Sequence, residues 1–575
     1  MHHMIEIFLI YLISSVFIFY ILKKVFFRLQ LSRAKHPSLR GHSKLSRRIA
    51  RLVPYFEYDE NDFYCSDGAP ESIAHKRQKG LELLVDLSRK FNSGSNAFST
   101  SLEESVSDVD FTSAYRVPFP YRKFLNKELK TGRIVDKTKG VKIKDIDNNW
   151  RFDLSGSYGV NVFGYDFYRD CMEKGFEKVK QLGPVLGAYH PIIRENVEKL
   201  KLVSGLDEVS FHMSGTEAVM QAVRLARYHT GKTHLVRFCG AYHGWWDGVQ
   251  PGIGNQRKTN DVYTLRDRSD ITLKVLSTRN DIACVLINPI QAFHPNFDAP
   301  SDTTLISSDR STNYDRGLHT HWLEKLREVC TRKKIVLIFD EVFSGFRLGY
   351  RGAQEYFGVQ ADMVTYGKTL GGGLPIGVVC GQHKLMKRFR DDSPANISFA
   401  RGTFNSHPYV MGSMNEFLNR IEAPEYQLMY QQADELWNKR VEKLNQRLIE
   451  ENLPVHVANM HSVLTVLYSV PSRYNWMLQF YLHAEGLDLS WIGSGRMIMS
   501  FNFSDDDFSE VIECFVRAAK KMKNDCWWWQ DPHLSNKAIK RQMFNEMILA
   551  RFPFIGKIIQ KKIPGCTNET IKGVY

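Results

Sequence analysis

The stretch Leu337–Pro375 constrains the fold of this chain more than any other part of the sequence. An apolar run, Ile335–Phe339, leads into it and ends at Asp340, and a second run, Met363–Tyr366, is followed by Lys368 and three glycines. Short continuous apolar runs are typical of strands buried on both faces of a parallel sheet. Because α/β sheets place ligand chemistry at their strand ends, we expect the carboxylate and the amine to reach one pocket.

Polar residues also follow three other predicted strands. They are Ser214, Gly215 and Thr216 after a strand that begins at Val209, Tyr242 and His243 after His234–Phe238, and Gln291 after Ala283–Ile287. Helices predicted between the strands, such as Thr320–Lys333, indicate an α/β fold with a mainly parallel sheet. Each motif alone carries little information, because an isolated Ser-Gly-Thr turn is most often an ordinary helix cap.

The combination suits pyridoxal phosphate, because each motif meets a different need of that cofactor. Lys368 would form the Schiff base and then move the α-proton of the substrate as a general base. Asp340 would hold the ring nitrogen protonated, so that the ring acts as an electron sink. The other contacts would be the phosphate on Ser214, Gly215 and Thr216 at a helix N-terminus, the ring face on Tyr242 and the ring hydroxyl on Gln291.

These motifs resemble those of class III pyridoxal-phosphate-dependent aminotransferases of fold type I. The similar segments are SGTEAVMQAVRLAR, GAYHGWWD, FDEVFSGFR, GKTLGGGLPIG and RGTFNSHP, and the resemblance spans residues 111–522. Among the subgroups, the chain is similar to glutamate-1-semialdehyde 2,1-aminomutase. The resemblance implies a large cofactor domain, a smaller α+β domain and a homodimer with its sites at the subunit interface.

The resemblance also implies further site residues. Val342 and His243 lie in the matched motifs and are assigned to the cofactor. Thr403 is expected to reach the phosphate of the cofactor in the neighbouring subunit. Tyr158 matches an aromatic residue that borders the substrate pocket, and Arg116 or, alternatively, Arg122 is a candidate for binding a substrate carboxylate.

Two departures from the family pattern bear on the substrate. The family usually has Glu-Pro where this chain has Asn288-Pro289. In many members that glutamate pairs with an arginine that alternates between two substrate carboxylates. The segment Phe293–Asp315 is also longer and more polar than the family pattern implies. We therefore expect a substrate other than a standard pair of carboxylate-bearing compounds.

The N-terminal residues predict a membrane anchor. Ile5–Leu22 is apolar apart from one acid, and extended through Phe27 it approaches the roughly 20 residues that span a bilayer. Lys23 and Lys24 follow it, whereas no Lys or Arg precedes it, so the remainder of the chain is expected in the cytoplasm. A cleaved signal peptide would show a basic start and a small-residue cleavage site, and a buried helix would lack such flanks.

The basic residues after the anchor contribute to a net charge of +14. They favour anionic lipid headgroups. A nucleic-acid partner is not expected, because the basic run lacks interleaved aromatic residues and a binding fold. The nine cysteines form no Cys-x-x-Cys pair, which indicates reduced thiols and no metal site.

Six regions are expected along the chain. They are a transmembrane anchor (1–28), a basic segment and linker (29–110), the start of the small domain (111–165), the large cofactor domain (166–408), the rest of the small domain (409–525) and a tail (526–575). In the linker only Lys79–Phe91 shows helical periodicity, residues 92–101 look like a loop, and prolines argue against a helix at Tyr115–Arg122. The tail, with Trp527–Trp529 and a basic amphipathic stretch at Lys537–Lys562, suits a membrane interface or packing on the core equally well.

The leading hypothesis is a membrane-tethered aminotransferase. It would move an amino group from a donor amino acid to an aldehyde or ketone, and the tether suggests a long-chain or carrier-bound acceptor. An aminomutase, which exchanges the amino group within one substrate, is the first alternative. A non-catalytic membrane scaffold is the second, and the presence of Lys368, Asp340 and the phosphate turn argues against it.

Overall fold

A seven-stranded sheet forms the centre of the large domain, with the strand order β4-β10-β9-β8-β7-β5-β6. Its strands are β4 (Glu208–His212), β5 (His234–Phe238), β6 (Val262–Leu265), β7 (Ile282–Ile287), β8 (Val336–Asp340), β9 (Met363–Gly367) and β10 (Gly377–Gly381). Strands β6, β5, β7, β8 and β9 pair in parallel, and β10 is antiparallel to both neighbours. The predicted strands and the mainly parallel sheet are therefore confirmed.

Helices cover both faces of this sheet, which explains why β7, β8 and β9 are buried along their whole length. The helices of the large domain are α8 (Tyr165–Val179), α9 (Ile192–Ser204), α10 (Gly215–Thr230), α11 (Asp270–Thr278), α12 (Arg316–Lys333), α13 (Gly352–Phe357), α14 (His383–Met386) and α15 (Pro408–Arg420). Apolar residues of α10 pack on one face, and those of α9, α12 and α15 pack in a separate core on the other. The computed structural model describes residues 2–36, 41–132, 134–250, 252–257, 259–290, 315–489 and 495–552.

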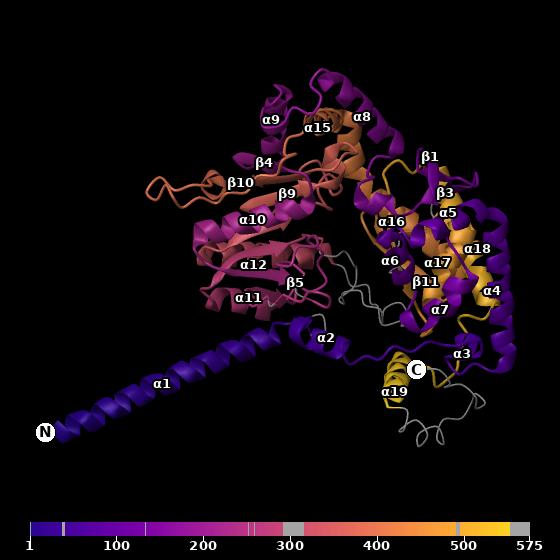
Figure 1. The fold of residues 1–575 in the computed structure, drawn as a ribbon, viewed down its shortest axis with the longest axis horizontal. Coiled ribbons are helices and arrows are strands. Elements are labelled where there is room, and N and C mark those ends of the chain that lie inside the picture. The colour runs from indigo at the N-terminus through magenta and orange to yellow at the C-terminus, as the bar shows by residue number, and fades with distance from the viewer. Residues whose placement is uncertain are drawn as a thin grey trace.

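The small domain lies beside the large one and contains two sheets (Figure 1). One sheet has the order β1-β2-β3-β13 and the other the order β11-β12-β14. The elements are β1 (Val135–Lys139), β2 (Lys142–Asp145), β3 (Trp150–Asp153), β11 (Val455–Met460), β12 (Val463–Tyr468), β13 (Leu487–Asp488), β14 (Arg496–Ile498), α16 (Pro424–Glu450), α17 (Leu478–Ala484) and α18 (Asp505–Asn524). The predicted hairpin at Val141–Leu154 is confirmed by the antiparallel pairing of β2 and β3.

The boundary expected at residue 409 differs from the packing. Helix α15 contributes Val410, Met414 and Phe417 to the core of the large domain, and its Met411 carbonyl accepts a hydrogen bond from Asn196 Nδ2 at 3.0 Å. The large domain therefore continues through α15. The next helix, α16, runs from this core into that of the small domain.

A helix occurs where the prolines were expected to exclude one. Helix α7 (Phe119–Glu128) begins inside the segment Tyr115–Arg122, with Pro120 in its first turn. Proline is tolerated there, because the first N–H groups of a helix have no carbonyl partner within the helix. The prolines mark the start of this helix.

The segment expected as a linker is largely helical. Its elements are α2 (Ser43–Ala50), α3 (Glu60–Cys65), α4 (Glu71–Phe91), α5 (Ser93–Glu103) and α6 (Ser107–Tyr115). The helix predicted at Lys79–Phe91 is confirmed as the second half of α4, and its Leu81 and Leu84 are buried in the small-domain core. The loop expected at 92–101 is instead α5, because the Asp147 carboxylate accepts from the N–H groups of Gly94 and Ser95 at 2.7 and 2.8 Å. A segment far along the chain thus supplies the cap of this helix.

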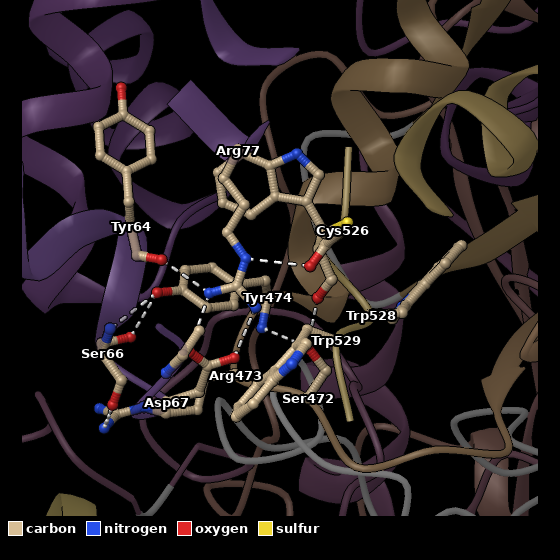
Figure 2. Close-up of polar contacts among 12 residues, drawn as sticks. Tyr64, Ser66, Asp67, Arg77, Ser472, Arg473, Tyr474, Cys526, Trp528 and Trp529 are labelled. Carbon is tan, nitrogen blue, oxygen red and sulfur yellow. Dashed lines mark hydrogen bonds and ion pairs between the residues drawn. The ribbon is translucent and has the colours of Figure 1, made fainter. Parts of the chain in front are cut away.

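The C-terminal tail packs on the small domain. Trp527 and Trp528 are 0% and 6% exposed, and their indole N–H groups donate to Tyr481 and Asn475. Figure 2 shows how Arg77 of α4 donates to the Cys526 carbonyl at 3.0 Å. The membrane-interface interpretation is therefore wrong for these two tryptophans, whose apolar rings fill a core and whose N–H groups are satisfied there.

Helix α19 (Asn536–Arg551) follows the tryptophans and is held by its acidic residue. Glu546 pairs with the buried Arg473 at 2.6 Å and accepts from the Tyr58 hydroxyl at 2.6 Å. These contacts join the tail to the segment before α3. In the described part of the chain, the tail and the expected linker from Phe56 onward therefore form one unit with the small domain.

Helix α1 (His2–Arg33) projects from the body of the molecule (Figure 1). Residues 4–33 have a mean hydropathy of 2.4 in their most apolar window, and that window is 0% buried. By length and composition α1 can cross a membrane, a criterion that a signal sequence near an N-terminus also meets.

Candidate active site

Asp340, the last residue of β8, is held in one orientation by side chains from two other segments and by a backbone N–H of the loop that follows β8. It is only 3% exposed. Its Oδ2 lies 2.6 Å from Nδ1 of His243, and its Oδ1 accepts from Thr365 Oγ1 at 3.1 Å and from the N–H of Val342 at 3.2 Å. A carboxylate fixed by several donors is suited to holding a proton on a basic ring nitrogen.

His243 is completely buried behind this carboxylate rather than open to a ring above it. Burial lowers the pKa of its imidazole, while the hydrogen bond to Asp340 acts in the opposite direction. The lowered pKa favours the neutral imidazole, whose Nδ1 faces Oδ2 of Asp340. Its neighbour Tyr242 is 62% exposed, so its ring is available to a flat ligand.

Lys368 follows β9 and lies next to the Tyr158 turn. Its Nζ donates to the Tyr158 carbonyl at 2.8 Å and lies 4.8 Å from the centre of the Phe343 ring. Burial lowers the pKa of Lys368 to about 8; Asp340 raises it, and the cations Arg347 and Arg496 lower it further. A lowered pKa increases the fraction of neutral amine, which is the nucleophilic form.

The backbone around Lys368 is strained. Lys368 has a φ of 47°, and Ser157 and Tyr158, which lie across from it, have φ values of 45° and 59°. Residues with side chains rarely adopt this left-handed conformation, and such strain concentrates at functional sites. Three strained residues at one place support the assignment of a functional site here.

The Ser-Gly-Thr turn forms the N-terminus of α10. Ser214 caps the helix by accepting from the N–H of Glu217 at 3.2 Å. A Cβ on Gly215 would lie 2.7 Å from Val342 Cγ1, so glycine is needed for β8 and α10 to approach each other. A Cβ on Gly244 would lie 2.3 Å from Thr216 Oγ1, which brings the turn after β5 to the same point.

These residues fit pyridoxal phosphate. The α10 N-terminus offers N–H groups and hydroxyls to a phosphate, Asp340 offers a fixed carboxylate to a ring nitrogen, and Lys368 offers an amine of lowered pKa. When bound, the cofactor supplies an electron sink. The residues of this chain would orient it, with Asp340 retaining the proton on the ring nitrogen and Lys368 moving a proton at the substrate α-carbon.

Other predicted site residues lie elsewhere or outside the described residues. Arg116 is 8% exposed on the small domain, where its carbonyl accepts from Gln479 of α17 at 2.8 Å and it lines a small cavity with Phe480, so its role at a substrate carboxylate stays a prediction. The packing of the turn before α7 on α17 places it there rather than beside Lys368. Thr403 is exposed, as a residue that reaches a second subunit would be. Gln291 lies outside the described residues.

Arg347 is a residue near the site that the sequence reasoning missed. It is 0% exposed, and its Nη1 donates to Ser462 Oγ and to the Met499 carbonyl, each at 2.8 Å. Burial lowers the pKa of its guanidinium to about 10. Arg347 is the last residue of the FDEVFSGFR segment, and its place in that family-like motif could have identified it. It joins the loop after β8 to the small domain.

Comparisons with known proteins agree with this geometry. A sequence model of the family described as aminotransferase class-III matches residues 125–261 and 317–519. Glutamate-1-semialdehyde 2,1-aminomutase of Methanocaldococcus jannaschii is 30% identical over 66% of this chain and 84% of that protein. The Hyperthermus butylicus protein of the same name is 30% identical over 68% of this chain and 92% of its own length.

Solved structures of the same class share the fold. A transaminase with PLP bound has a TM-score of 0.58 and 25% identity, covering 74% of this chain and 98% of that one. A glutamate-1-semialdehyde aminomutase from Pseudomonas aeruginosa PAO1 has a TM-score of 0.61 and 17% identity, covering 78% and 99%. The fold is thus that of type I pyridoxal-phosphate enzymes. The chain belongs to the class III aminotransferase family and is an enzyme that uses pyridoxal phosphate.

Proposed function

We propose that the enzyme moves an amino group from a donor amino acid to an aldehyde or ketone that is long-chain or carrier-bound. The observation that carries this proposal is Lys368 of lowered pKa beside the fixed carboxylate of Asp340. Asn288 supports an unusual acceptor. It is a buried neutral amide, 7% exposed, where many relatives have the glutamate that neutralises a carboxylate-binding arginine.

The proposed location is a membrane face, with α1 as a single-pass anchor and the catalytic part in the cytoplasm. Support comes from the exposed apolar surface of α1 and from the lysines and arginines that follow it. Anchoring would bring the enzyme to substrates that partition into lipid.

A homodimer is also proposed. Tyr242, Trp245, Phe399 and Phe404 are more than half exposed, and all lie in segments that adjoin the site or Thr403. Exposed aromatic residues at this density are typical of a surface that a partner covers. Within a dimer, Thr403 would complete the phosphate site of the other subunit.

A substrate screen with the full chain in detergent tests the reaction. The loaded enzyme is mixed with candidate amino donors, and the spectral change of the cofactor is followed; the aminated enzyme is then offered carbonyl compounds of increasing chain length. We expect long-chain aldehydes or ketones to react faster than short soluble semialdehydes. Equal rates for short and long acceptors would contradict the proposed acceptor class.

An aminomutase is the second candidate, because the relatives above carry that name. Such an enzyme needs no separate amino donor. Glutamate 1-semialdehyde alone, offered to enzyme in the aminated form, would then be converted over many turnovers. If turnover requires an added amino acid in stoichiometric amounts, the aminotransferase assignment holds.

A further inference from the structure

The foot of α1 is part of the large domain. Ala34, just after the helix, is 0% exposed in the core, and its carbonyl accepts from the N–H of Arg266, directly after β6, at 2.8 Å. Gln30 Oε1 accepts from Thr278 Oγ1 of α11 at 2.9 Å. The N-terminal helix is therefore not joined to the enzyme by a loose tether.

Helix α2 contacts the large domain close to this point. Arg47 Nη1 donates to the carbonyls of Asn255 and Arg257 at 2.9 and 3.2 Å, and Arg51 Nη2 donates to Gln256 Oε1 at 3.2 Å. These acceptors lie in the connection from β5 to β6. The N-terminal segment thus contacts this connection before β6 and the chain directly after it.

The β5–β6 connection, which Arg47 and Arg51 contact, begins at the cofactor site. It leaves β5 through Tyr242, His243 and Gly244, of which His243 contacts Asp340 and Gly244 abuts Thr216. Farther along, the Asn255 side chain donates to the carbonyls of Asp247 and Gln250 at 3.1 and 2.8 Å. The described residues of the connection therefore form one folded unit between the cofactor turn and Arg47.

We propose that Arg47 is a positioning residue for the cofactor site, acting through the β5–β6 connection. Its guanidinium binds the carbonyls of Asn255 and Arg257 in this connection. Hydrogen bonds from a charged donor are stronger than those from a neutral donor. Residues 255–257 then restrain the turn after β5, which carries Tyr242 and Gly244. Residues 30–51 lie outside the segments matched by the family model, so this restraint is an addition to the family fold.

The test compares Arg47→Ala with Arg48→Ala in the full chain in detergent. Arg48 is the adjacent arginine of α2, is exposed, and provides the matched control. We expect Arg47→Ala to raise hydrogen–deuterium exchange at residues 252–257 of the cofactor-free enzyme. We also expect it to weaken pyridoxal phosphate binding about tenfold, or about 1.4 kcal/mol. Arg47→Lys, which keeps a charged donor, should restore much of both properties, and Arg48→Ala should resemble the wild type.

Two results would overturn the proposal. The first is unchanged hydrogen–deuterium exchange at residues 252–257 in Arg47→Ala. The second is increased exchange there with unchanged affinity for pyridoxal phosphate, because the contacts of Arg47 would then have no effect on the cofactor site. The inference rests on the proposed assignment of the Tyr242 turn to the cofactor. Neither readout needs a substrate, so failure to find a donor or acceptor would count against the proposed reaction alone.

Discussion

Lys368 and Asp340 are the residues whose roles are most directly testable. Replacing Lys368 by Ala removes the amine that bonds the cofactor, so the absorbance band of the covalently held cofactor should disappear. Phosphate and ring contacts remain, so pyridoxal phosphate should still bind in a dialysable form. A Lys368→Ala protein that keeps the covalent band would show that another amine holds the cofactor.

The lowered pKa of Lys368 predicts how cofactor loading depends on pH. The neutral amine attacks the cofactor aldehyde, and its fraction rises as the pH passes the pKa of about 8. The rate of loading onto cofactor-free enzyme should therefore increase between about pH 6 and about pH 9 and then level off. Rates that still climb steeply near pH 10.5, the ordinary pKa of lysine, would contradict the lowered value.

At the residue scale, the sequence predicted the cofactor chemistry better than it predicted the contacts between side chains. Asp340 and Lys368 were predictable because both follow apolar strands. The position of His243 behind Asp340 was not, because it depends on how the turn after β5 folds against β8. The contact of Arg116 with Gln479 of α17 was not predictable for a similar reason, because the two residues are far apart in the sequence.

Substituting Gly244 tests how closely α10, β8 and the turn after β5 must approach one another at the Ser-Gly-Thr turn. Its φ is 87°, and a Cβ would lie 2.3 Å from Thr216 Oγ1. Gly244→Ala should therefore displace the turn and weaken cofactor binding by about tenfold or more. Gly187→Ala is the matched control, because its φ of 84° imposes similar strain while nothing lies within 4 Å of the new Cβ. Equal losses in both variants would show that backbone strain, not contact with Thr216, is responsible.

At the scale of elements, strands and long helices were predictable, whereas several short helices, α5 and α7 among them, were not. The strands β7, β8 and β9 are continuous apolar runs, a local signal. Helix α5 depends on Asp147, which caps it from a distant part of the chain. Helix α7 was missed because its prolines are compatible with a first turn but not with a helix interior.

The ion pair between Arg473 and Glu546 predicts how strongly the tail stabilises the whole molecule. The Arg473 side chain is 2% exposed and that of Glu546 is 26% exposed. Glu546→Gln should lower the free energy of unfolding by about 1–3 kcal/mol, because it leaves a buried guanidinium without its carboxylate. Glu513→Gln removes the exposed partner of Arg447 and should leave the free energy of unfolding almost unchanged. Chemical denaturation of the full chain measures both, and equal effects would show that the tail adds no stability through this pair.

At the scale of the whole molecule, the fold of the part that resembles the family was predictable from the sequence. The structure of the segments before and after that part was not. The segments 52–110 and 526–552 carry none of the family motifs, and their order comes from contacts with each other and with the small domain, whereas residues 30–51 contact the large domain. The pair of Arg77 and Asp67, both buried, and the Cys526 carbonyl illustrate this, because no local pattern links α4 to the tail (Figure 2).

The core of the small domain has a consequence for how the protein is made. It contains Tyr58 and Phe63 from near the start of the chain and Trp527 and Ile539 from near its end. A ribosome releases these residues in order, so the early ones are synthesised long before their partners exist. Until then Phe63 and its neighbours expose apolar surface, which favours chaperone binding and makes the nascent chain prone to aggregation. The large domain can close earlier, because Val463 is the last of the buried residues in its core. We therefore expect the cofactor domain to fold first and the small domain to close only after Trp527 and Ile539 have been made.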